Sequence, residues 1–165
     1  MPPVETTTAP EPPFVAGRVV HTVAGVRLRV RLGLRGRWSL TSVVPDGVGY
    51  LVTDDRWFEG TLGMHRLDAY GRLVSSWAST GPALAGPRGR AVWVSLVAPE
   101  SGETGPTLVH VGDRAQDVRP LVQPSLEAYD GEVVTFTARR KEGRRYVRRA
   151  FTIDLRSGHF PQIVR

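Results

Sequence analysis

Apolar and polar residues alternate in short runs along this chain, and no stretch follows the 3.6-residue period of an amphipathic helix. In residues 26–32, valine or leucine occupies every second position and arginine the others, which is typical of a strand with one buried face. The same alternation follows three turn-like glycines, Gly47, Gly89 and Gly131. A glycine turn that leads into period-two alternation indicates a turn followed by a strand. The pattern therefore predicts an all-β chain.

The three glycines stand 42 residues apart, an interval typical of the blades of a β-propeller. After each glycine the sequence predicts a strand, a polar hairpin, a second strand, a tight turn and a third strand. A short apolar link such as residues 82–85 would supply the innermost strand of the next unit. We therefore expect a β-propeller-like array of four-stranded antiparallel blades. The expected blades span residues 42–83, 84–125 and 126–165, and an incomplete blade spans residues 18–41.

Two segments resemble a known family. The turn Pro45-Asp46-Gly47 with its following strand, and the segment 64–73 with its Asp68-x-x-Gly71 turn, resemble the WD40-like repeats of TolB-type bacterial β-propellers. Residues 151–158 match the second half of that repeat again, whereas the middle unit departs from it and the Trp-Asp dipeptide of classical WD40 blades is absent. The resemblance implies a propeller fold and hardly any particular activity.

The number of units does not show how a propeller ring would be completed. Propellers usually have 4–8 blades, and this chain supplies three with a fragment of another. We therefore expect a partial propeller or half-ring. It would be a piece of a longer ring, half of a homodimer, or a four-blade ring closed by the N-terminal strands. Residues 1–17 are rich in proline and threonine and are expected to form a flexible tether.

Composition narrows the function classes. With 165 residues, 41% of them hydrophobic, the chain can bury a core, and the absence of cysteine excludes disulfides and cysteine-ligated zinc. No apolar run is long enough to cross a membrane. If a signal or anchor lies upstream, we expect the cell envelope of a bacterium, and otherwise the cytoplasm.

The net charge of +6 is concentrated in two places. Residues 27–37 and 139–149 together hold 12 of the 22 basic residues. The second segment predicts a basic hairpin that could hold an anionic partner, or simply a solvated hairpin that protects an edge strand. Nucleic acid is not the expected partner, because Tyr146 is the segment's single aromatic residue for base stacking.

A second candidate site surrounds the dipeptide Trp57-Phe58. Carboxylates flank this dipeptide at Asp54, Asp55 and Glu59. Carboxylates beside aromatic rings suit sugar contacts, a glycosidase pair or calcium, and the alternative is a polar loop with a packing tryptophan. His65 and His110 recur 45 residues apart, but they lack a close ligand spacing and are expected to be structural. We predict no catalytic residues, metal or cofactor.

The preferred hypothesis is a noncatalytic binding or scaffold module that presents hairpin loops to a protein or cell-envelope glycan. Its expected contact residues are Trp57, Phe58, Asp55, Glu59, Arg140, Arg144, Arg145 and Arg148. One alternative is a carbohydrate-active or hydrolytic propeller that uses Asp54, Asp55 or Glu59. A second alternative is an anionic-polymer binder that uses the 139–149 hairpin.

Overall fold

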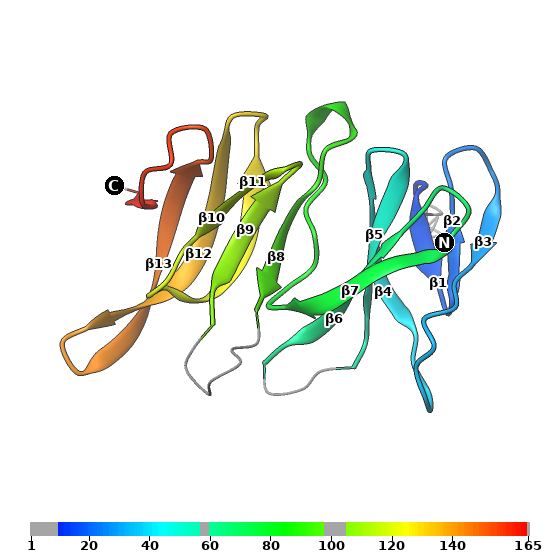
Figure 1. Ribbon diagram of the computed structural model, residues 1–165, viewed down its shortest axis with the longest axis horizontal. Coiled ribbons are helices and arrows are strands. Elements are labelled where there is room, and N and C mark those ends of the chain that lie inside the picture. Colours follow the sequence, from blue (N-terminus) through cyan, green and yellow to red (C-terminus); the bar gives the residue numbers. More distant parts are fainter. Residues whose placement is uncertain (1–9, 57–59, 98–104, 165) are drawn as a thin grey trace, which may run out of the picture.

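The computed structural model, which describes residues 10–56, 60–97 and 105–164, is all-β (Figure 1). A three-residue 3-10 turn, η1 (Pro87–Gly89), is the one helical element in these ranges. The N-terminal strands are β1 (Phe14–Ala16), β2 (Val19–His21) and β3 (Arg27–Arg29). The central strands are β4 (Leu40–Asp46), β5 (Gly49–Asp54), β6 (Leu62–Leu67), β7 (Leu73–Ser79), β8 (Val92–Leu96), β9 (Thr107–Val111) and β10 (Arg114–Asp117). The C-terminal strands are β11 (Val122–Tyr129), β12 (Val133–Glu142), β13 (Arg145–Asp154) and β14 (Gln162–Ile163).

The strands form three antiparallel sheets in which sequence neighbours pair. The sheet orders are β1-β2-β3, β10-β9-β8-β7-β6-β5-β4 and β11-β12-β13-β14. The seven-stranded sheet is curled, and a single residue pair, Ala78 with Leu96, joins β7 to β8. Beyond that junction, Leu84 forms an isolated bridge with Val92 of β8.

The expectation of separate four-stranded sheets is therefore met only in part. Strands β11–β14 form one four-stranded sheet, but the two glycine-led strands β5 and β8 share the seven-stranded sheet. The physical reason is the pairing of Ala78 with Leu96, which links two units that the sequence pattern alone would separate. The N-terminal sheet has three strands, and its first strand, β1, lies in the segment that the sequence pattern assigned to the tether rather than to the incomplete blade of residues 18–41.

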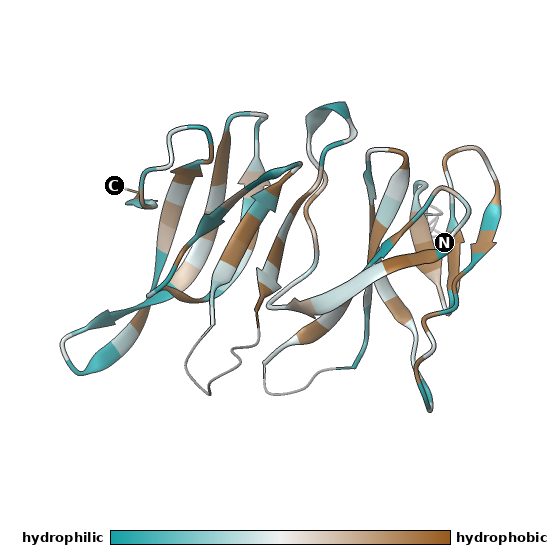
Figure 2. Ribbon diagram, in the orientation of Figure 1, coloured by the Kyte–Doolittle hydropathy of each residue, from teal (hydrophilic) through white to brown (hydrophobic). Residues whose placement is uncertain are grey.

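Among the described residues, buried apolar side chains form two separate core clusters. Hydrophobic positions recur along the strands at both ends of the molecule in Figure 2. One core combines residues of the N-terminal sheet and the following loop, such as Val20 and Trp38, with Val52 of β5 and Leu67 of β6. The other combines Val94 and Val109 of β8 and β9 with residues of the C-terminal sheet, including Phe136 and Phe151. Strict alternation in β12 produces the second core, because Val134, Phe136 and Ala138 all point to one face.

The 42-residue repeat corresponds to turns that lie near each other in space. Gly47, Gly89 and Gly131 all adopt positive φ, at 61°, 67° and 102°. The Gly47 N–H donates a 2.9 Å hydrogen bond to the Gly89 carbonyl, and Gly131 lies against Pro87. The three turns line one edge of the molecule, at the top of Figure 1.

Asp46, from the Pro-Asp-Gly turn, connects adjacent units. Its Oδ1 accepts a hydrogen bond from the Ala91 N–H at 3.2 Å, and its Oδ2 forms a 2.6 Å ion pair with Arg66 Nη1. A single side chain thus joins the β4–β5 turn to β6 and to the segment before β8. This contact gives the repeated turn a structural role between units.

Candidate functional site

The hairpin of β12 and β13 contains the predicted basic segment. The two ten-residue strands pair over their whole length, from Val133 with Asp154 to Glu142 with Arg145. Gly143, at φ 62°, permits the two-residue loop that reverses the chain. The tip extends beyond the neighbouring strands at the lower left of Figure 1. This arrangement holds the cations on a paired backbone.

Three of the seven cationic side chains in this segment form hydrogen bonds or ion pairs with nearby protein groups. Glu142 accepts hydrogen bonds from Arg140 at 2.7 Å and from Arg149 at 2.9 and 3.0 Å. Hydrogen bonds from Arg149 and then Arg140 lower the pKa of Glu142 to about 2, so this carboxylate is ionised at neutral pH. Arg148 donates to Thr137 Oγ1 at 2.9 Å and to the Gln123 carbonyl.

The other four cations are exposed and have no anionic partner within the described part of the chain. They are Arg139, Lys141, Arg144 and Arg145. Of the predicted contact residues, Arg144 and Arg145 therefore remain available, whereas Arg140 and Arg148 hold structural contacts. The sequence pattern could not single out Arg148, because its partners, Thr137 and Gln123, come from β12 and β11 rather than from its own strand.

An apolar cavity of about 460 Å³ adjoins the hairpin at Tyr146, close to its tip. Its lining includes Leu96, Leu121, Val122 and the hairpin's Tyr146. Val122 pairs with Arg139 across β11 and β12, so the cavity and the free cations share this region of the surface. The sequence offered no signal for this cavity, because its walls come from six separate segments.

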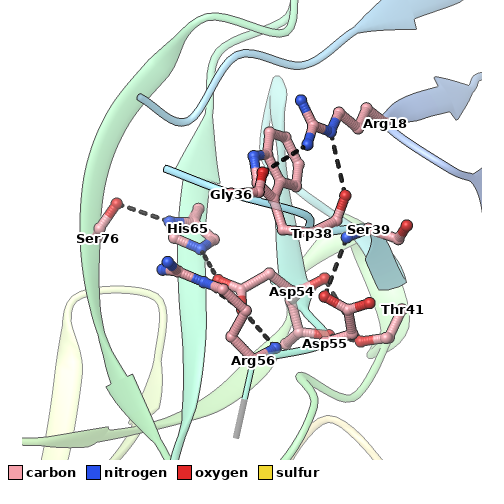
Figure 3. Close-up of polar contacts among 11 residues, drawn as sticks. Arg18, Gly36, Trp38, Ser39, Thr41, Asp54, Asp55, Arg56, His65 and Ser76 are labelled. Carbon is pink, nitrogen blue, oxygen red and sulfur yellow. Dashed lines mark hydrogen bonds and ion pairs between the residues drawn. The ribbon is translucent and has the colours of Figure 1, made fainter. Parts of the chain in front are cut away.

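The predicted carboxylate cluster has a different geometry from a paired-carboxylate site. Asp54 is 1% exposed, and its Oδ2 accepts a 2.7 Å hydrogen bond from His65 Nε2 (Figure 3). Its Oδ1 accepts the Arg56 N–H at 2.9 Å. Asp55 instead accepts the Ser39 N–H at 3.0 Å. The two aspartates therefore have different partners, and Trp57, Phe58 and Glu59 lie outside the described residues.

His65 completes a hydrogen-bonded chain of Asp54, His65 and Ser76. The His65 Nδ1 lies 2.7 Å from Ser76 Oγ, so both ring nitrogens have a side-chain partner. The three residues stand 11 apart in the sequence, on β5, β6 and β7. Cross-strand register explains their meeting, since His65 pairs with both Val52 and Ser76. That equal spacing across two hairpins was the signal that sequence reasoning missed.

These are the residue types of a serine hydrolase triad, which also requires a substrate cavity and donors for an oxyanion. The cavities at the β12–β13 hairpin and at the 87–90 turn are lined by other residues. Asp54, His65 and Ser76 connect three adjacent strands by side-chain hydrogen bonds.

His110, on β9, belongs to a row of rings that continues with Trp93 of β8 and Trp77 of β7. Its ring stacks on Trp93 at 3.7 Å between centroids, and its Nε2 lies 2.7 Å from Ser95 Oγ. Burial, and secondarily the charge of Arg66, lowers the pKa of His110 from 6.5 to about 4. The described residues contain no group of three or more side chains able to hold a metal ion.

The depressed pKa predicts that acid destabilises the fold through His110. The unfolded chain binds a proton near pH 6.5 and the folded chain only near pH 4, so stability is full above 6.5 and falls as the pH drops toward 4. Allowing for partial exposure, we expect a loss of about 1–3 kcal/mol. Urea titrations at pH 7.5 and pH 4.5 measure it, and His110→Gln should flatten the difference. An unchanged pH dependence in that variant would contradict the assignment.

No known protein family, curated protein or solved structure matches this chain in the comparisons. Within the described ranges, no helix has the length and apolar character needed to cross a membrane.

Proposed function

We propose that this protein is a noncatalytic binding module that presents the β12–β13 hairpin to an acidic segment of a partner protein. The main support for this proposal is the set of cationic side chains on the hairpin that lack a counter-charge among the described residues. Arg139, Lys141, Arg144 and Arg145 are exposed on a paired hairpin and lack an anionic partner in the residues that the structure describes. An acidic segment would supply the missing counter-charges.

The proposed scaffold is a partial β-propeller. Three units with a 42-residue repeat, the lateral hydrogen bond between the Gly47 and Gly89 turns, and the four-stranded C-terminal sheet support this hypothesis. The weak junction of β7 with β8 is consistent with a boundary between blades. The face of β12 opposite its buried residues carries Thr135 and Thr137, so that face is polar enough to stay in contact with water.

Electrostatics explains how the hairpin would select its partner. Glu142 restrains Arg140 and Arg149, and the pairing of β12 with β13 fixes the backbone beneath the four free cations. A preorganised cationic surface attracts acidic segments and raises their association rate, while it repels basic ones. The adjoining apolar cavity at Tyr146 would add contact area for an apolar side chain of the same segment.

The experiment is a titration with a fluorescent peptide that contains alternating glutamate and threonine. We expect binding that weakens as salt increases, and a Kd raised about 30-fold or more when Arg139, Lys141, Arg144 and Arg145 all become alanine. The matched control replaces four exposed arginines elsewhere, Arg27, Arg29, Arg31 and Arg35, and thereby makes the same change in net charge. Equal losses in the two variants would mean nonspecific attraction and would contradict the proposal.

A further inference from the structure

The unpaired edge of β13 indicates how an acidic segment could be held. Strand β13 runs from Arg145 to Asp154, but β14 pairs with it only at Phe151 and Thr152. One more hydrogen bond, from the Val164 N–H to the Ala150 carbonyl at 2.9 Å, extends this contact. Within the described ranges, the half of β13 nearest the hairpin tip therefore pairs with β12 on one side and with no strand on the other.

The direction of the backbone groups on this edge follows from the same contacts. The Ala150 carbonyl points toward β14, and in an antiparallel strand alternate residues direct both their N–H and C=O groups to the same side. Tyr146 and Arg148 share that direction, so four main-chain groups face the open edge. Among the described residues, no hydrogen bond reaches those groups of Tyr146 and Arg148.

We infer that an acidic, extended segment of the partner adds to the edge of β13 as a further antiparallel strand, in line with β14. This inference rests on the proposed binding function and specifies its mode. Main-chain hydrogen bonds to Tyr146 and Arg148 would supply affinity that is independent of side chains, as in other cases of strand addition.

The charges around the edge select the occupant. Arg145 and Arg148 lie on β13, and Lys141 lies opposite Tyr146 on β12. Cations along an edge strand oppose pairing with a second copy of the same strand, because like charges would meet. The carboxylates of an acidic strand would instead be attracted to these cations. Half-exposed Tyr146 gives this strand one apolar contact at the cavity.

Amide hydrogen exchange, measured by NMR with and without the acidic peptide, tests the inference. We expect exchange of the Tyr146 and Arg148 amides to slow at least about tenfold on binding. The amides of Val147 and Arg149 face β12 already and should change little. Binding that leaves the Tyr146 and Arg148 amides unprotected would overturn strand addition but preserve the proposed function, whereas failure of the acidic peptide to bind would overturn both.

Two N-methylated peptides provide a matched control. Methylation of the peptide N–H groups that would face β13 should weaken binding at least about tenfold, and methylation of the alternate N–H groups should leave the Kd nearly unchanged. Equal effects of the two peptides would contradict strand addition. Protection of Tyr146 and Arg148 that grows with protein concentration in the absence of peptide would assign the edge to a second copy of this chain and overturn the inference.

Discussion

Replacing Gly63 by alanine is expected to lower the free energy of unfolding by about 2–4 kcal/mol. A Cβ atom at this position would overlap Asp54 Oδ2 and lie 3.1 Å from His65 Nε2. The methyl group would therefore separate the buried carboxylate from the imidazole and leave two buried polar groups poorly paired. The hydrogen bonds that connect β5, β6 and β7 depend on the absence of a side chain at Gly63.

Urea unfolding of the wild type and the variant measures this loss. Gly81→Ala is the matched control, because its Cβ would meet no atom within 4 Å, and its stability should change by less than about 1 kcal/mol. Adding Gly63→Ala to an Asp54→Ala variant should cost less than adding it to the wild type, because the overlap is gone. Strict additivity of the two changes would disprove the proposed cause.

Asp46→Ala is expected to destabilise the protein by about 2–4 kcal/mol, although Asp46 belongs to a turn. The substitution removes the 2.6 Å ion pair with Arg66 and the acceptor of the Ala91 N–H. Arg66, which lies 5.5 Å from the Trp93 ring centroid, would lose its counter-charge at the contact between neighbouring units. The effect is large because one carboxylate holds two segments that are 45 residues apart along the chain.

Chemical denaturation of three variants separates the contributions. Asp46→Asn retains an oxygen for the Ala91 N–H and should lose about half as much stability as Asp46→Ala. Asp113→Ala, an exposed carboxylate in the β9–β10 turn, is the control and should change stability by less than about 0.5 kcal/mol. If Asp46→Ala behaves like Asp113→Ala, the contact between units contributes nothing to stability.

Both substitutions act on the scaffold, and the binding proposed for the hairpin depends on that scaffold. A rigid contact between units keeps the two cores in place, and the C-terminal core anchors the buried half of β12 and β13 through Phe136 and Phe151. Because these phenylalanines also pair across the two strands, the hairpin tip extends from a fixed base. Substitutions at the tip can therefore change binding without changing the fold.

The local elements of the fold can be read from the order of residues along the chain. Alternation of apolar and polar residues predicted the strands, and the glycines at 47, 89 and 131 predicted the turns, because these features depend only on neighbours along the chain. The concentration of basic charge on one hairpin was also evident from the sequence.

Which strands share a sheet, and which of the hairpin's cationic side chains lack an anionic partner among the described residues, follows from contacts in the folded chain. The link of β7 to β8, the chain of Asp54, His65 and Ser76, and the open edge of β13 each require contacts between segments that are far apart in the sequence. Periodicity places a side chain on one face of its own strand, but it does not determine which strand will pair with it. Pairing energies between strands depend on register and packing, which exist only in the folded chain.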